Sequence, residues 1–210
     1  DTLNAFRPAP ARAAGRGLAA PTVGVFLGLL LGLSATSGAA MLGAIPYWAA
    51  LLANVILLYV MAHINHEAIH RNISGGVRDL NWLNEMIGHI GSFWFFLPFP
   101  AFKAVHLAHH GAPNDPQKDG DMWVARKNPL MVFATCSTIL VGYEFQIWRL
   151  AREGKISGRS LAIIYSQRLA ALFLIGACFA AGFGREIMMF WGVPALITMP
   201  GLAFFFAYVV

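Results

Sequence analysis

The histidines of this sequence gather in two short stretches. Six of the seven lie in HINHEAIH (63–70), with His63, His66 and His70, and in HLAHH (106–110), with His106, His109 and His110. On a helix, the first three lie within about 60° of each other and the second three within about 100°. Each stretch therefore predicts one imidazole face on a helix.

Two imidazole faces in one chain indicate metal binding. A neutral imidazole donates a lone pair to a metal ion, which offsets the cost of clustering ionisable groups at a membrane boundary. Six imidazoles exceed what one tetrahedral zinc can use, so we expect two metal ions. Imidazole suits zinc, copper, iron and nickel alike, so the residue types alone do not choose the metal.

The rest of the chain is typical of a membrane protein. It is 58% hydrophobic with a mean hydropathy of +0.60, and only 12% of its residues are charged. That charged fraction is about half of what a soluble domain carries. No Asp, Glu, Lys or Arg occurs from Gly17 to Ala62, a run much longer than the roughly 20 residues of one span. We therefore expect two spans there, folded back at Gly43–Pro46.

The elements that position the histidines are predicted to be helices. We expect an all-α membrane protein in which about four transmembrane helices form two hairpins, at about 21–43, 46–64, 161–184 and 187–210. Segment 82–100 is predicted to be interfacial or half-inserted, and 129–150 to be an interfacial helix or a weak span. Residues 1–20 resemble a flexible tail, with a cleaved secretory signal as the alternative for the first apolar run.

The basic residues predict the orientation. Segment 71–160 carries most of the Lys and Arg, so the positive-inside rule makes it a cytoplasmic, histidine-rich cap. The Ala/Gly/Arg-rich style favours a bacterial inner membrane. The net charge of +5 indicates no nucleic-acid partner, because the basic residues form no stripe with aromatics. Cys136 and Cys178 lie in apolar stretches and are interpreted as small buried residues.

These stretches also resemble a known family. HEAIH (66–70) resembles the first histidine box, HxxxH, of the membrane fatty acid desaturases, and HLAHH (106–110) resembles their second box, HxxHH. The following NDPQKDGD (114–121) is similar to the Asn-Asp-Pro…Asp stretch that often follows the second box in bacterial members. The resemblance covers about residues 45–210.

The resemblance implies a cofactor, a reaction and partners. It implies two iron ions in a non-haem diiron centre, O2 as co-substrate, and desaturation of a long-chain acyl lipid. It also implies an electron donor protein of the ferredoxin, rubredoxin or cytochrome b5 type. By this resemblance the iron ligands are His66, His70, His106, His109 and His110.

Other polar residues are assigned supporting roles. His63 precedes the first box at a helical spacing, and we expect it to be a ligand or to hold one in place. Carboxylates that accept the second N–H of a bound imidazole are expected at Glu67, Asp115, Asp119 and Asp121; for the aspartates, an ordinary Asx turn is the alternative. His89 is isolated and is interpreted as an interfacial histidine. Trp94–Phe96 and Trp123 are candidates for lining a substrate slot or for interfacial anchoring.

One feature of the family has no counterpart here. The family carries a third histidine box after its last hairpin, but no histidine follows His110. We expect residues 21–210 to be a desaturase-like membrane domain truncated before that box. Three alternatives stay open: a membrane hydroxylase or ketolase of alkanes, carotenoids or other lipids, a non-catalytic membrane metal-binding or transport protein, and an inactive scaffold.

Overall fold

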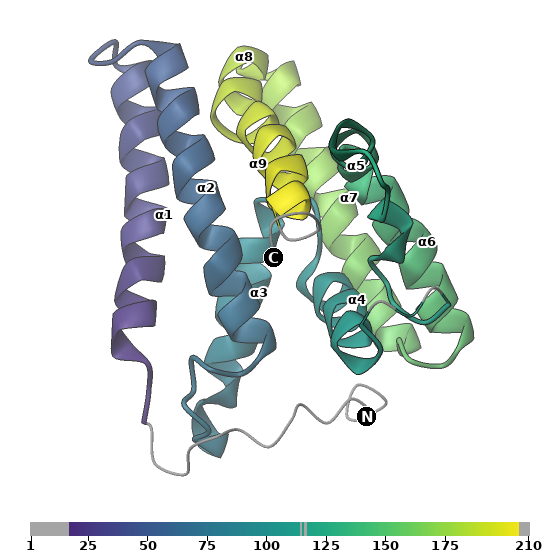
Figure 1. Cartoon of the computed structure of the whole chain (residues 1–210). Helices are drawn as coiled ribbons and strands as arrows, with labels where there is room; N and C mark the ends of the chain where they lie inside the picture. Colours follow the sequence, from purple (N-terminus) through teal and green to yellow (C-terminus); the bar gives the residue numbers. More distant parts are fainter. Residues whose placement is uncertain (1–16, 114, 116, 206–210) are drawn as a thin grey trace. The chain divides into compact units, whose positions relative to one another are not determined.

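The computed structural model describes residues 17–113, 115 and 117–205, and their regular structure is helical (Figure 1). The all-α prediction is confirmed. The chain divides into two compact units. Of the described residues, the first unit comprises 17–96 and 169–198, and the second comprises those within 97–168 and 199–205. Most of the tail predicted at 1–20, and the end of the chain at Val210, lie outside the described residues.

Within the part of the chain that the structure describes, four helices are long and apolar enough to cross a membrane, as the sequence predicted. They are α1 (Ala20–Met41), α2 (Tyr47–Ile69), α7 (Gly158–Ala180) and the continuous stretch Gly184–Phe204. Helices α5 (Pro129–Cys136) and α6 (Ile139–Arg152) together pass the same test, but they are bent by 69° at the break between them. That bend leaves 129–150 either a broken span or a re-entrant segment.

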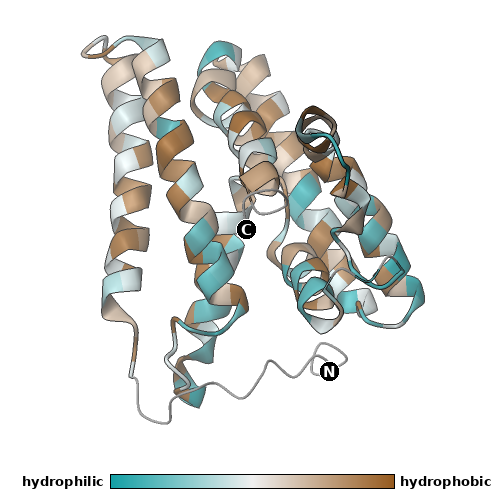
Figure 2. Cartoon of the chain, in the orientation of Figure 1, coloured by the Kyte–Doolittle hydropathy of each residue, from teal (hydrophilic) through white to brown (hydrophobic). Residues whose placement is uncertain are grey.

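Helices α1 and α2 form the predicted first hairpin. The turn between them contains Gly43 at φ +75, a conformation that glycine adopts without steric cost. Small residues let the two helices approach: Ala40 and Ala50 are buried together, and Gly32 leaves room for Leu57. Figure 2 shows apolar residues along most of both helices and hydrophilic residues gathering where α2 ends.

A buried asparagine ties this hairpin to the last span. Asn54 of α2 is 0% exposed, and its Oδ1 accepts a hydrogen bond from Thr36 Oγ1 at 2.5 Å. Its Nδ2 donates to Ser37 Oγ and to the Phe190 carbonyl at 3.0 Å. Phe190 lies in a π-helical segment, η4 (Met188–Gly192), between α8 (Gly184–Ile187) and α9 (Val193–Phe204). Asn54 thus provides a partner for a backbone carbonyl where the regular helix is interrupted.

Segment 82–100 contains one helix and the start of another. Helix α3 (Asn81–Phe93) follows the short η2 (Arg78–Leu80) and packs against α2. At 13 residues it is about 20 Å long, too short to cross a bilayer core of about 30 Å. The indole of Trp191 stacks on Phe93 and Phe96 and donates to the Trp94 carbonyl at 2.9 Å. This bond satisfies a carbonyl where α3 ends.

The second unit contains α4 (Phe99–Gly111), which packs against α6. Pro98 caps the start of α4, and Pro100 lies in its first turn. The loop after α4 leads to η3 (Met122–Val124) and then to α5. On α6, Glu144 accepts hydrogen bonds from Trp148 and Tyr165 and pairs with Arg168. Ile147 and Leu150 are fully buried. Helix α6 is therefore held firmly against α4, the helix that carries the second histidine stretch.

The two buried asparagines of α2 should respond oppositely to substitution by leucine. Asn54→Leu removes the partners of Ser37 and Phe190 and should lower the free energy of unfolding by about 1–3 kcal/mol. Asn65 is also 0% exposed, but neither of its side-chain polar atoms has a partner. Asn65→Leu should therefore be neutral or stabilising. Thermal unfolding in detergent measures both, and an equal loss at Asn65 would contradict the assignment.

Candidate metal site

The first histidine stretch occupies the last two turns of α2, in the first unit. His66 and His70 lie one turn apart with ring centroids 4.6 Å from each other. His63 is exposed, and its Nδ1 lies 2.9 Å from the Tyr59 carbonyl of the preceding turn. Since a carbonyl only accepts, that contact makes Nδ1 the protonated nitrogen and leaves the lone pair of His63 on Nε2.

Glu67 contacts its neighbour His66 at a distance too long for a hydrogen bond. Its Oε1 lies 3.6 Å from His66 Nδ1, and its Oε2 accepts from Asn72 Nδ2 at 2.8 Å. Asn72 thereby fixes the carboxylate at the end of α2, where the backbone turns at Arg71 with φ +60. Glu67 lies where the sequence expected a carboxylate beside the first box.

The second histidine stretch lies at the end of α4, in the second unit. His106 and His110 face each other, and their Nε2 atoms are 3.0 Å apart. Two nitrogens that are each about 2.1 Å from one ion, at about 90°, also lie about 3 Å from each other. The spacing of this pair therefore fits two ligands of a single metal ion.

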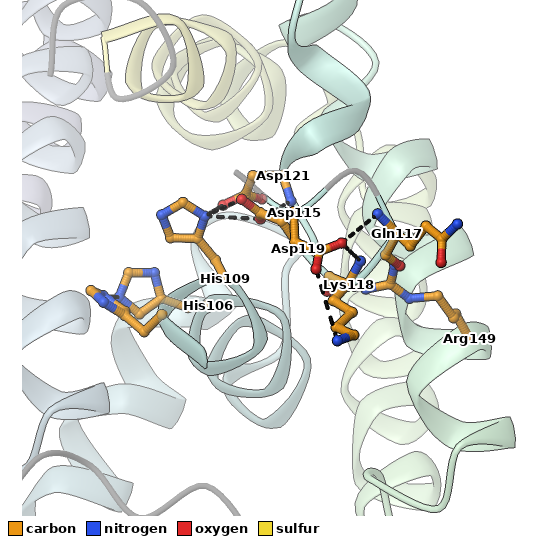
Figure 3. Close-up of polar contacts among 9 residues, drawn as sticks. His106, His109, Asp115, Gln117, Lys118, Asp119, Asp121 and Arg149 are labelled. Atoms are coloured by element: carbon orange, nitrogen blue, oxygen red, sulfur yellow. Dashed lines mark hydrogen bonds and ion pairs between the residues drawn. The ribbon is translucent and has the colours of Figure 1, made fainter. Parts of the chain in front are cut away.

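His109 is held by a buried carboxylate. Its Nδ1 lies 2.9 Å and 3.0 Å from the two oxygens of Asp119, whose residue is only 3% exposed (Figure 3). An ionised carboxylate only accepts, so Nδ1 carries the proton and Nε2 keeps its lone pair. A carboxylate on the second nitrogen is the arrangement that orients metal-bound histidines in proteins. Asp119 thus lies where it can accept the Nδ1 proton of His109, and its role at a metal site stays a prediction.

The other two aspartates differ in their contacts. Asp115 Oδ1 accepts from the backbone N–H of Gln117 and Lys118, which holds the pKa of Asp115 below its usual value and makes it an Asx turn. Asp121 lies 3.7 Å from His109 Nδ1. Its pKa is raised to about 6 by burial, a rise that His109 opposes and Asp119 reinforces.

The raised pKa of Asp121 has a consequence for the metal-free fold. The protonated form stabilises that fold below about pH 4, the usual range of an aspartate. This contribution is lost as the pH rises through about 6. At neutral pH the ionised Asp121 therefore favours a nearby cation, since an opposite charge offsets the cost of burial.

The donor set fits redox iron as well as other imidazole-binding ions. One group of possible ligands within a single unit, made of His109, Asp119 and Asp121, has ligand atoms within 4.8 Å of one another. The Nε2 atoms of His106 and His110 add a pair whose 3.0 Å spacing fits two ligands of one ion. The two carboxylates contact His109 at Nδ1 rather than at Nε2. The donors left for an ion are therefore imidazole nitrogens, which suit iron as well as zinc, copper and nickel.

Some of the predicted residues are not members of these groups. His89 lies on α3, and Trp94 and Phe96 surround Trp191 in the first unit. Trp123 packs against Gly142 in the second unit. Sequence reasoning missed Arg149 of α6, which donates to two carbonyls of the loop after α4. No motif or spacing marks that arginine.

Asp119 should set the tautomer of His109 in the metal-free protein. In Asp119→Asn the amide can donate as well as accept, so the population with the proton on Nδ1 should fall. Nitrogen NMR of histidine-labelled protein measures this, with the His109 signal identified by its loss in His109→Ala. Asp115→Asn is the matched control because Asp115 contacts backbone amides. An unchanged tautomer in Asp119→Asn would show that Asp119 does not orient the ring.

Comparison with known proteins identifies relatives of this chain. The Fatty acid desaturase family matches residues 42–209. The chain is 28% identical over 196 residues to an sn-1 oleoyl-lipid 12-desaturase of Picosynechococcus sp.. The match covers 85% of this chain and 54% of the relative, so the chain spans about half the length of that relative. No solved structure matches the chain significantly. The family match covers most of the chain and includes both histidine stretches, so the chain belongs to the fatty acid desaturase family.

Proposed function

We propose that the chain forms part of an O2-dependent enzyme that desaturates a fatty acyl chain at a non-haem diiron centre. Membership of the family and the four apolar helices make it a desaturase-like membrane oxidoreductase. The observation that carries the finer proposal is the second histidine stretch. There the Nε2 atoms of His106 and His110 converge, and buried Asp119 holds His109.

Each histidine would have a defined part. His66 and His70 at the end of α2, and His106, His109 and His110 at the end of α4, would bind the ions through imidazole nitrogen. His63 is a sixth candidate, through Nε2. The bound irons would supply the oxidising power, with O2 as the oxidant. A third histidine box, absent from this sequence, would provide the remaining ligands.

The chain's own groups keep the imidazoles ready for binding. Asp119 accepts the Nδ1 proton of His109, so that ring offers the metal a lone pair rather than an N–H. Asp121 adds negative charge 3.7 Å from the same ring. Glu67 would act in the same way at His66, once a small rotation shortens their 3.6 Å contact.

The substrate and partners follow from the same membership. The relative is named for an oleoyl group on a lipid, and we propose a long acyl chain carried by a membrane lipid as substrate. Removing two hydrogens while O2 is reduced to water requires two more electrons. We propose a ferredoxin, rubredoxin or cytochrome b5 type donor. The basic segment 71–160 would place the histidines on the cytoplasmic side of a bacterial inner membrane.

Metal content and product analysis test this proposal. The full natural chain, purified in detergent, should contain about two irons, and both His66→Ala and His109→Ala should lose most of that iron. His89→Ala is the matched control and should keep it, since His89 lies on α3 and belongs to neither histidine stretch. Lipids from cells expressing the chain should gain cis double bonds, and both ligand variants should abolish that gain.

Other results would redirect the assignment. New hydroxyl groups in the lipids, with the iron content intact, would make the enzyme a hydroxylase with the same metal site. One zinc per chain, or no metal, would contradict the diiron proposal.

A further inference from the structure

The loop between α4 and η3 carries the carboxylate that orients His109. Within this loop, Asp119 Oδ1 accepts both from His109 Nδ1 and from the Asp121 backbone N–H at 2.8 Å. The side chain of Asp119 can therefore reach His109 only when the loop backbone is in one place. What fixes the loop thus decides where the imidazole points.

The loop's own turns do not anchor it to the helices. Asp115 binds the amides of Gln117 and Lys118, and the Asp119 N–H donates to the Asp115 carbonyl at 3.0 Å. These bonds shape the loop internally. Besides the bond from His109, the loop therefore needs contacts with residues outside it to hold it in place against the helices.

Two such contacts are seen among the described residues. At Gly120 the loop backbone lies against α4, since a Cβ there would come within 2.8 Å of Val105 Cγ1. From the other side, Arg149 of α6 donates through Nη1 to the Gln117 carbonyl at 2.9 Å and through Nη2 to the Lys118 carbonyl at 3.0 Å (Figure 3). These carbonyls belong to the two residues just before Asp119.

The guanidinium is suited to this task. Its planar fork binds two neighbouring acceptors at once and fixes direction as well as distance, which a lysine ammonium does not. Helix α6 packs against α4, and the neighbours of Arg149, Ile147 and Leu150, are fully buried. Arg149 therefore fixes the loop relative to α6, and through the packing of α6 on α4 it fixes the loop relative to His109.

We propose that Arg149 is a positioning residue for the metal site. It clamps the carbonyls of residues 117 and 118 so that the Asp119 carboxylate stays beneath His109 Nδ1. The inference rests on the proposed function for its purpose, but the clamp itself is a property of the metal-free chain. A simple stabilising role for Arg149 would not make its effect depend on Asp119.

A double-mutant cycle on Co²⁺ binding tests this dependence. In the metal-free full natural chain, Asp119→Asn should weaken Co²⁺ binding about 10- to 100-fold, the range for groups that orient metal ligands. Arg149→Met should weaken it about tenfold. The double variant should bind no more weakly than Asp119→Asn alone, because both changes break the same link. Arg149→Lys should recover little, since it keeps the charge without the fork.

Arg152→Met is the matched control, because Arg152 is an exposed arginine one turn along the same helix. It should leave Co²⁺ affinity unchanged. Losses that multiply in the double variant, or no loss in Arg149→Met, would overturn the inference. A variant that fails to fold is replaced by Arg149→Lys, for which the same coupling is expected.

A second readout requires no metal. Arg149→Met should shift the His109 tautomer in the same direction as Asp119→Asn, and amide hydrogen exchange at residues 117–121 should accelerate. An unchanged tautomer and unchanged exchange would overturn the clamp. If the natural chain bound neither iron nor Co²⁺, the proposed function would fail, while these metal-free measurements would still decide the role of Arg149.

Discussion

Polar groups in an apolar chain must find their partners within the chain itself. An unsatisfied carbonyl or amide costs several kcal/mol in lipid, so each interruption of a regular helix needs a specific donor. Asn54 provides that donor at the π-helical segment around Phe190, and the Trp191 indole provides it where α3 ends. The helical irregularities of the first unit are therefore fixed by side chains distant in sequence.

The same constraint governs the histidines. An imidazole can bind a metal only through a nitrogen that keeps its lone pair, so its other nitrogen must donate its proton to a defined acceptor. For His63 that acceptor is the Tyr59 carbonyl on its own helix, and for His109 it is the buried Asp119. A backbone carbonyl one turn earlier on the same helix, as Tyr59 is for His63, is available from helix geometry alone. A carboxylate acceptor depends on a loop, which then needs anchors of its own.

This difference explains what could be predicted from the sequence. The four apolar helices, the turn at Gly43 and the two imidazole faces depend on composition and helical periodicity, which are local. Asp119 was predicted because it follows the second box closely. The clamp of Arg149 on residues 117 and 118 could not be, because it joins positions over 30 residues apart and acts on backbone carbonyls, which have no sequence signature.

Asn54 and Asn65 show the same limit within one helix. Both lie on the buried face of α2, eleven positions or about three turns apart, and the sequence gives no reason to distinguish them. Asn54 meets hydroxyls and a carbonyl freed by the π-helical segment, whereas the Asn65 amide packs tightly against Gly91 and has no hydrogen-bond partner. The value of a buried polar residue is set by the opposing element, so periodicity identifies the buried face while the packing decides whether the residue stabilises it.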